Sequence, residues 1–215
     1  MEWVRAGSDF ERAASELLRE SLADRLRQKS RVSLALSGGS TPWPILRTLA
    51  DADLDWTRVD VFQVDERVAP EGDPARNLVG IRTALLDHVP ATVFPMPVDV
   101  PDLDEAVAAY DHLLPPTIDV VHLGLGEDGH TASLVPGDPV LDLVDRRVAI
   151  TEPYRGHRRM TLTYPTLETS GAIIWIVSGA RKAAMTERLR SADPTIPAGR
   201  VTQTHARLVT DFGAT

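Results

Sequence analysis

The stretch RVSLALSGGSTPWPILRTLA, at residues 31–50, contains the pattern that indicates the fold. Residues 31–36 are a short apolar run of the kind found in buried strands. The turn SGGSTP follows at 37–42, with Thr41 placed as the N-cap and Pro42 as the first residue of a helix over 42–50. A strand, a glycine turn and a helix in direct succession predict one unit of an α/β fold.

The same order of segments recurs along the chain. Further strands are predicted at 59–64, 118–125, 146–152, 159–164 and 172–179. Further helices are predicted at 8–29, 77–89, 102–114 and 180–190. In the first of these helices, Ser8 and Glu11 have the spacing of a capping box.

Strands that are apolar throughout and separated by helices are typical of parallel sheets covered on both faces. We therefore predict an α/β fold with a single doubly wound, mainly parallel sheet, helices on both faces and a Rossmann-like topology. It forms one domain over residues 1–215, because no internal repeat, low-complexity segment or linker interrupts the pattern.

Composition excludes several classes of function. The chain has 215 residues, 43% of them hydrophobic, and its lack of cysteine excludes disulfides, thiol chemistry and cysteine zinc sites. A formal net charge of −8 argues against nucleic acid as a partner. No apolar run is long enough to cross a bilayer, and the N-terminus lacks the order of a signal peptide. We expect a cytoplasmic protein without a membrane partner or an obligate protein partner.

Polar segments directly follow four of the predicted strands. They are SGGSTP (37–42), DER (65–67), GLGEDGHTASLVPG (124–137) and SGARK (178–182). In open parallel sheets, ligands bind beyond the carboxyl ends of the strands, where the strand order reverses. We therefore expect these four loops to meet at one ligand site.

The residue types in these loops suit an anionic ligand and proton transfer. Glycine amides together with the hydroxyls of Ser40 and Thr41 suit a phosphate, and the guanidinium of Arg67 can bind one through two nitrogens. Imidazole titrates near neutrality, which makes His130 a candidate general base. Lys182 is one of two lysines among 23 Lys and Arg residues, which indicates a need for a compact cation there.

Each loop also has a simpler interpretation. SGGSTP can be an ordinary turn before a capped helix, DER a solvated loop, His130 a loop histidine and Lys182 a surface residue. One shared site explains all four together, because each loop follows a strand at the edge where a parallel sheet binds its ligand.

In their order and separations, SGGSTP, DER, GLGEDGHTASLVPG, RMTLT and VSGARK resemble the 6-phosphogluconolactonase family. These motifs run from residue 37 to residue 182, and DGHTASL is the most specific of them. The wider group includes glucosamine-6-phosphate deaminases, whose corresponding loop differs at Thr131, Ser133 and Leu134 and which usually have an aromatic at Arg67. Both differences favour the lactonase. Val135 departs from the phenylalanine usual in lactonases, so it could alter an apolar wall of the pocket.

The resemblance implies metal-free hydrolysis of 6-phospho-D-glucono-1,5-lactone to 6-phosphogluconate, in the oxidative pentose phosphate pathway and without a cofactor. The candidate catalytic residues are His130, Asp128 and Asp65. The candidate substrate- and phosphate-binding residues are Gly38, Gly39, Ser40, Thr41, Arg67, Arg159 and Lys182. The sequence leaves open which carboxylate orients His130 or the water. It also leaves open whether the glycine amides of 126–129 or Arg159 stabilise the oxyanion.

Three other functions are compatible with these residues. A glucosamine-6-phosphate deaminase would use the same scaffold and release ammonia. A non-catalytic sugar-phosphate sensor would bind without turnover, although no DNA-binding segment accompanies the domain. A hydrolytic metal site on Glu127, Asp128 and His130 has no strong ligand spacing in its favour.

Overall fold

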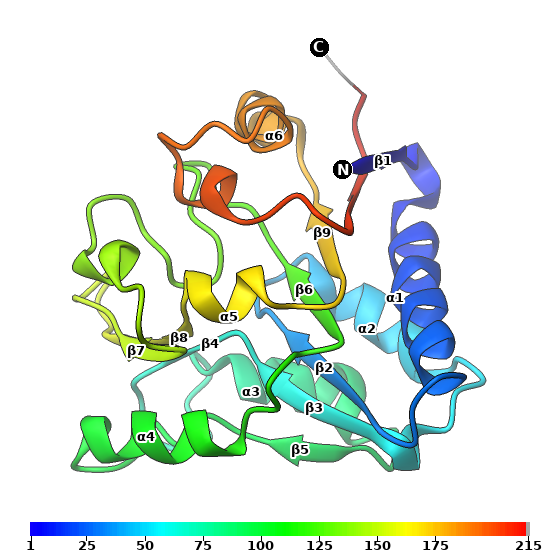
Figure 1. The fold of residues 1–215 in the computed structure, drawn as a ribbon. Helices are drawn as coiled ribbons and strands as arrows, with labels where there is room; N and C mark the ends of the chain where they lie inside the picture. The colour runs from blue at the N-terminus through cyan, green and yellow to red at the C-terminus, as the bar shows by residue number, and fades with distance from the viewer. Residues whose placement is uncertain (214–215) are drawn as a thin grey trace.

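The structure is a computed structural model that describes residues 1–213. The last two residues of the predicted domain, 214–215, lie outside the described part. Among the described residues, the larger of two sheets has seven strands, all paired in parallel (Figure 1). In spatial order they are β1 (Glu2–Arg5), β10 (Ala206–Thr210), β9 (Ile173–Val177), β6 (Val120–Leu123), β2 (Val32–Leu36), β3 (Val59–Gln63) and β5 (Thr92–Phe94).

The strand order reverses at the centre of this sheet. From β2 the chain moves outward through β3 to β5, and it then returns to the other side of β2 with β6, followed by β9 and β10. The neighbours β2 and β6 therefore send their following loops in diverging directions. This is the switch point at which open α/β sheets form a ligand crevice.

Helices cover both faces of the large sheet, as the sequence predicts. They are α1 (Phe10–Leu26), α2 (Pro42–Ala50), α3 (Asn77–Ile81), α4 (Leu103–Leu113), α5 (Tyr164–Glu168) and α6 (Ala183–Arg190). Short helical turns accompany them: η1 (Gly7–Asp9), η2 (Trp56–Arg58), η3 (Arg82–Leu86), η4 (Pro139–Asp142), η5 (Ala180–Lys182) and η6 (Pro197–Arg200).

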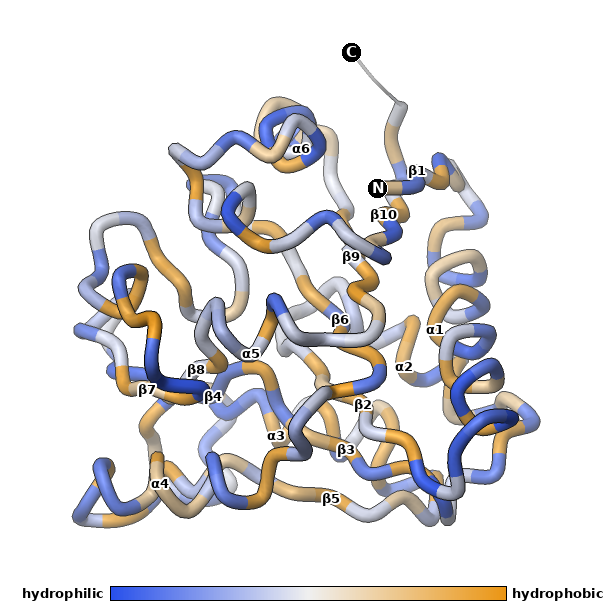
Figure 2. The backbone as a smooth tube through the Cα atoms, in the orientation of Figure 1, coloured by the Kyte–Doolittle hydropathy of each residue, from blue (hydrophilic) through white to orange (hydrophobic). Residues whose placement is uncertain are grey.

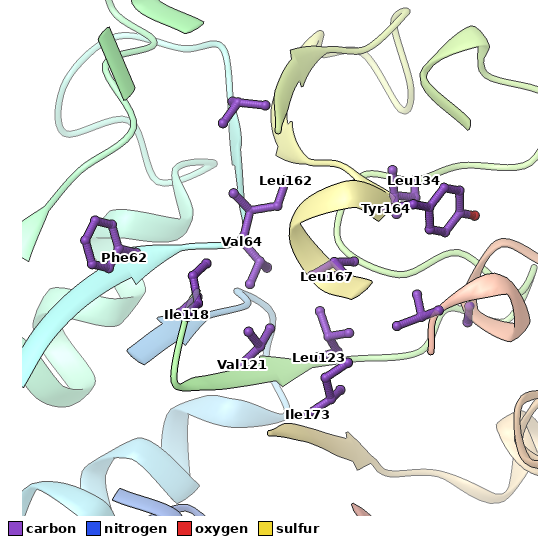
Figure 3. Packing of buried hydrophobic residues seen from close by; sticks show 14 of the residues in the cluster. Phe62, Val64, Ile118, Val121, Leu123, Leu134, Leu162, Tyr164, Leu167 and Ile173 are labelled. Carbon is purple, nitrogen blue, oxygen red and sulfur yellow. The ribbon is translucent and has the colours of Figure 1, made fainter. Parts of the chain in front are cut away.

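Alternate side chains of each central strand enter different cores. In β9, Ile174 and Ile176 pack with residues of α1, α2 and α3, whereas Ile173, Trp175 and Val177 pack with α4, α5 and α6 on the other face. Figure 3 shows the second core, where apolar side chains from the sheet and α5 converge. Figure 2 shows the same apolar character along the central strands β6 and β9. Burial on both faces explains why these strands are apolar throughout.

A second, antiparallel sheet lies beside the first, on the left of Figure 1. Its order is β4 (Asp65–Arg67), β8 (Arg159–Leu162) and β7 (Val148–Ile150). The assignment of 65–67 to a loop is therefore wrong, because these residues pair with β8. The segments at 146–152 and 159–164 do form strands, but they belong to this sheet rather than to the parallel one.

Other local expectations need correction. Helix α1 begins at Phe10 after the turn η1, and no side chain caps it, so the capping box from Ser8 to Glu11 is wrong. Thr41 does precede α2 as its N-cap residue, although its side chain makes no capping hydrogen bond. Within residues 1–213, no helix combines the length and the apolar character needed to span a bilayer.

Candidate active site

A pocket of about 510 Å³ lies at the switch point, beyond the carboxyl ends of β2, β6 and β9. All four polar segments expected from the sequence contribute to its wall. Of the ten candidate residues, nine line the pocket directly: Gly38, Gly39, Ser40, Thr41, Asp65, Arg67, His130, Arg159 and Lys182. The tenth, Asp128, lies behind His130 and contacts it.

His130 and Asp128 form a hydrogen-bonded pair at one side of the pocket. Asp128 Oδ1 is 2.5 Å from His130 Nδ1 and also accepts the backbone amide of His130, at 3.3 Å. This contact places the imidazole proton on Nδ1 and leaves Nε2 as the free acceptor. The His130 side chain is 20% exposed and lines the pocket, so substrate or water can reach it.

The glycines around this pair are required by close packing. A Cβ on Gly126 would lie 2.1 Å from His130 Nδ1 and 2.7 Å from Asp128 Oδ1. Gly129 has φ +82°, and a Cβ there would lie 2.7 Å from Ile196. The His130 imidazole therefore leaves no room for a side chain at Gly126, whereas Gly129 is required by its positive φ and by the nearby Ile196.

Asp128 has a second partner that the sequence did not reveal. The hydroxyl of Tyr154 donates to Asp128 Oδ2 at 2.9 Å, and its ring meets the His130 ring edge to face at 5.6 Å. Burial opposes ionisation of Asp128, but the hydrogen bonds from His130 and Tyr154 more than offset it, so the pKa of Asp128 is lowered. Asp128 is thus held as a carboxylate beside the imidazole.

Asp65 lies in a different environment from Asp128. It is 5% exposed, accepts from Ser133 Oγ at 2.6 Å and from Asn77 Nδ2 at 3.1 Å, and makes no hydrogen bond to His130. Burial raises the pKa of Asp65. Of the two carboxylates considered from the sequence, the structure therefore brings only Asp128 into contact with His130.

Two arginines face each other across the small sheet. Arg67 of β4 and Arg159 of β8 are directly paired positions, an arrangement that is unfavourable for like charges. Among residues 1–213, neither guanidinium has a carboxylate partner at ion-pair distance, and the Nε atom of each is buried without a hydrogen bond. Burial and the charge of Arg67 lower the pKa of Arg159, outweighing the nearby Asp65. An anionic ligand would relieve this repulsion.

Further cations complete a positively charged wall. Lys182 stands at the end of η5, and Arg155 and Arg181 also line the pocket, although the sequence did not single them out. Burial lowers the pKa of Lys182. Arg181 pairs with Glu127 at 3.4 Å. In a chain of net charge −8, this concentration of cations marks a site for a negatively charged group.

The glycine loop after β2 forms another part of the pocket wall. Gly38 packs so closely against Asn77 that a Cβ would lie 1.9 Å from the Asn77 amide oxygen. Gly39 has φ +114° and is exposed, as is Ser40. Val135, in contrast, is buried in the core and is not itself part of the pocket wall.

Two further wall residues, Asn77 and His122, were not singled out from the sequence. His122 is fully buried within β6, where its Nδ1 accepts the Ser37 amide at 3.3 Å, and burial lowers its pKa to about 4. Thr131 Oγ1 and Asn77 Oδ1 are buried without a hydrogen-bond partner. No local pattern distinguishes Asn77 and His122, because each reaches the pocket through the packing of separate elements.

Within the described residues, no three His, Cys, Asp or Glu side chains converge as a group that could hold a metal ion. The alternative metal site on Glu127, Asp128 and His130 therefore has no ligand cluster in this structure. Instead, Glu127 pairs with Arg181 and Asp128 with His130 and Tyr154.

Comparisons with known proteins show which families and folds this chain is similar to. The sequence profile of the family described as glucosamine-6-phosphate isomerases/6-phosphogluconolactonase matches residues 6–210. The 6-phosphogluconolactonase of a Nostoc species is 35% identical over 78% of this chain and 75% of its own length. That of Mycobacterium tuberculosis is 35% identical over 86% of this chain and 84% of its own length.

Solved structures are similar over nearly the whole chain. A crystal structure of 6-phosphogluconolactonase from Thermotoga maritima superposes with a TM-score of 0.89 at 24% identity, covering 97% of this chain and 98% of that one. The structure of the Trypanosoma brucei 6-phosphogluconolactonase has a TM-score of 0.86 at 25% identity, with 97% and 95% coverage. The first of these similarities concerns the fold alone.

Proposed function

Because the chain belongs to the glucosamine-6-phosphate isomerase/6-phosphogluconolactonase family, we propose that it hydrolyses 6-phospho-D-glucono-1,5-lactone to 6-phosphogluconate. One structural observation supports this proposal independently of the family assignment. A single pocket has an imidazole paired with a carboxylate at one side and several cations, most without carboxylate partners, on its wall. That combination fits a substrate with an ester-like carbonyl at one end and a phosphate at the other.

In this proposal His130 transfers the protons. Its Nε2 takes a proton from water as the water oxygen attacks C1 of the lactone, and the positive imidazole is stabilised by Asp128 at Nδ1. The tetrahedral intermediate then collapses, the bond from C1 to the ring oxygen breaks, and His130 returns its proton to that oxygen. The product is the open-chain hydroxy acid, and His130 ends as it began.

The developing negative charge on the C1 oxygen needs a hydrogen-bond donor. Two of the glycine amides considered from the sequence are already occupied: Gly126 N donates to His130 O at 2.8 Å and Gly129 N to Gly126 O at 3.1 Å. Arg159 has an unpartnered Nε and lies against the Tyr154 ring, beside the His130 pair. This favours Arg159 as the oxyanion donor.

The cations orient the substrate by its phosphate. Arg67 and Lys182 are the principal ligands in this proposal, with Arg155 beside them and with Ser40 and Thr41 contributing hydroxyl donors from the glycine loop. Gly38 and Gly39 let the phosphate or the sugar hydroxyls approach the backbone. Because the phosphate end of the substrate is anchored, C1 is held near His130. Part of the binding energy is thereby used to orient the reacting carbonyl.

Asp65 has a supporting role in this scheme. It accepts from Ser133 Oγ, which lies 3.5 Å from Arg159 Nη1, and it stands next to Arg67 in β4. In this proposal Asp65 supports Arg159 through Ser133 Oγ, without a direct ion pair, whereas Asp128 orients the base.

The direct test adds purified protein to freshly generated 6-phosphogluconolactone, with a chelator present, and records acid release against the spontaneous rate. We expect a clear acceleration that the chelator does not abolish. A parallel assay offers glucosamine 6-phosphate and measures ammonia. Ammonia release without lactone hydrolysis would move the assignment to the deaminase branch of the family, and binding without either reaction would indicate a sensor.

A further inference from the structure

The tip of the β7–β8 hairpin reaches into the neighbourhood of His130. Tyr154 and His157 pair across a two-residue turn formed by Arg155 and Gly156, whose φ angles are +50° and +87°. Such a turn is typical of tight hairpins, but an arginine at positive φ is strained. The strained residue is also the one that lines the pocket, which indicates that the tip is shaped for the site.

At this tip, Tyr154 contacts both functional sides of the pocket. Its hydroxyl donates to Asp128 Oδ2 at 2.9 Å, while the other oxygen, Oδ1, is held by His130. The guanidinium carbons of Arg155 and Arg159 lie 5.1 Å and 5.2 Å from the centre of the Tyr154 ring. The ring therefore stands between the cations and the proton-transfer pair.

We propose that Tyr154 is a positioning residue for proton transfer: its hydroxyl fixes the Asp128 carboxylate, and the carboxylate fixes the His130 imidazole. This inference rests on the proposed lactonase function. Tyr154 does not line the pocket, so it acts through Asp128 and does not touch the substrate. The chain of contacts runs from the Tyr154 hydroxyl through both carboxylate oxygens of Asp128 to His130 Nδ1.

The geometry explains why a second donor on Asp128 matters. A carboxylate held at one oxygen can rotate about its Cβ–Cγ bond, and the imidazole would rotate with it. With a donor on each oxygen, the plane of the carboxylate is set, and with it the direction of His130 Nε2. Burial and the hydrogen bond to Asp128 raise the pKa of Tyr154, so the hydroxyl stays a donor at neutral pH.

Tyr154 also moderates the charge of Asp128. The charged groups around the pair are Arg155 and Arg159 from the hairpin, and Glu127, Arg181 and Lys182 from the loops after β6 and β9. A carboxylate that shares its charge with the Tyr154 hydroxyl binds the protonated imidazole less tightly. Removing the hydroxyl therefore favours protonated His130, whereas removing the charge of Asp128 favours neutral His130.

The test compares Tyr154→Phe with the wild type in lactone hydrolysis across pH. Tyr154→Phe keeps the ring and its contacts to the arginines, so we expect KM to change less than twofold. We expect kcat to fall about tenfold, the usual scale for one hydrogen bond to a charged group. The midpoint of the acidic limb of the kcat profile should move to higher pH, and in Asp128→Asn it should move to lower pH.

Tyr164→Phe is the matched control. The Tyr164 hydroxyl also makes one hydrogen bond, to Pro197 O at 2.9 Å, but it lies in the core away from the pocket. This variant should lose thermal stability and keep the pH midpoint of the wild type. If Tyr154→Phe behaves like this control, or loses activity only through KM, Tyr154 is a structural residue and the inference is wrong.

A second readout separates this inference from the lactonase assignment. NMR of the His130 imidazole in substrate-free protein follows its protonation without any turnover. The titration midpoint should rise in Tyr154→Phe relative to the wild type and stay unchanged in Tyr164→Phe. If the wild type fails to hydrolyse the lactone, the proposed function is wrong, and the His130 titration still decides the role of Tyr154. Equal midpoints in wild type and Tyr154→Phe would overturn it.

Discussion

Lys182 shows how a single residue can separate binding from chemistry. Lys182 lines the pocket, is proposed to bind the phosphate, and has no ion-pair partner among residues 1–213. Lys182→Ala removes one charged contact to the phosphate, so we expect KM to rise about tenfold to a hundredfold with a smaller change in kcat. Arg67→Ala should behave in the same way, as measured by steady-state kinetics.

Lys29→Ala is the control for that prediction. Lys29 is the other lysine of the chain, and it pairs with Asp119 at 2.5 Å, away from the pocket. Its removal should leave KM unchanged. A Lys182→Ala enzyme that kept its KM and lost only kcat would contradict the phosphate-anchor role.

The buried imidazole of His122 should make the stability of the protein depend on pH. Burial lowers the pKa of His122 from 6.5 to about 4, so the unfolded chain binds a proton there before the folded protein does. The free energy of unfolding should therefore fall as pH drops from 6.5 toward 4. Between pH 7 and pH 5 the loss from this group amounts to about 2 kcal/mol.

Urea unfolding of the wild type and His122→Asn at both pH values measures this contribution. Asparagine can still accept the Ser37 amide but cannot titrate in this range. The variant should lose less stability than the wild type between pH 7 and pH 5, whatever its stability at pH 7. Identical losses in the two proteins would show that His122 does not contribute.

At the scale of elements, the pairing of β4 with β8 makes a ligand-dependent prediction. The register places Arg67 opposite Arg159, and their repulsion is strongest in the unliganded protein. Inorganic phosphate, which binds only the folded site, should raise Tm by several degrees at saturating concentration. In Arg67→Ala most of this rise should disappear.

The Arg67→Ala variant is needed as a comparison because phosphate also stabilises folded proteins in general, by being excluded from their surface. Differential scanning fluorimetry of both proteins, at matched ionic strength and with chloride as the reference anion, separates phosphate binding at the site from the general stabilising effect. If wild type and Arg67→Ala gain the same Tm from phosphate, the rise is a general solvent effect and the arginine pair is not an anion site.

Local sequence patterns predicted some elements well and others poorly. Strands β2, β3, β6 and β9 are mainly apolar because most of their residues are buried, and that property is visible in the sequence. The short strands β1, β5 and β10 were not predicted. Strand β4 was taken for a loop because only its pairing with β8, far along the chain, makes it a strand.

The residues of the candidate site also divide into those that local sequence indicates and those that it does not. His130, Arg67 and Lys182 follow strands of the central region directly, so the topology of a parallel sheet was enough to bring them together. Tyr154 and Arg155 belong to a hairpin whose position depends on the second sheet, and nothing local marks their approach to Asp128. Arg159 is also placed by long-range pairing, and it was named only because the motif RMTLT resembles the family.

The whole molecule combines an acidic chain with a locally basic pocket. The net charge is −8. Among residues 1–213, the pocket is nevertheless lined by two carboxylates, Asp65 and Glu127, and by five cations: Arg67, Arg155, Arg159, Arg181 and Lys182. The fold makes this possible by gathering loops from both sheets at the switch point. It places His130, the proposed proton acceptor, and the proposed phosphate ligands Arg67 and Lys182 in one pocket, so in this proposal binding and hydrolysis depend on the same architecture.

The most direct test of this account measures the initial rate of acid release from 6-phosphogluconolactone with wild type and His130→Ala side by side, above the spontaneous rate. A general base contributes a factor of about 10² to 10⁴, so His130→Ala should lose roughly 3–5 kcal/mol of transition-state stabilisation and keep its KM. A folded variant that retains more than a tenth of the wild-type rate would contradict the account.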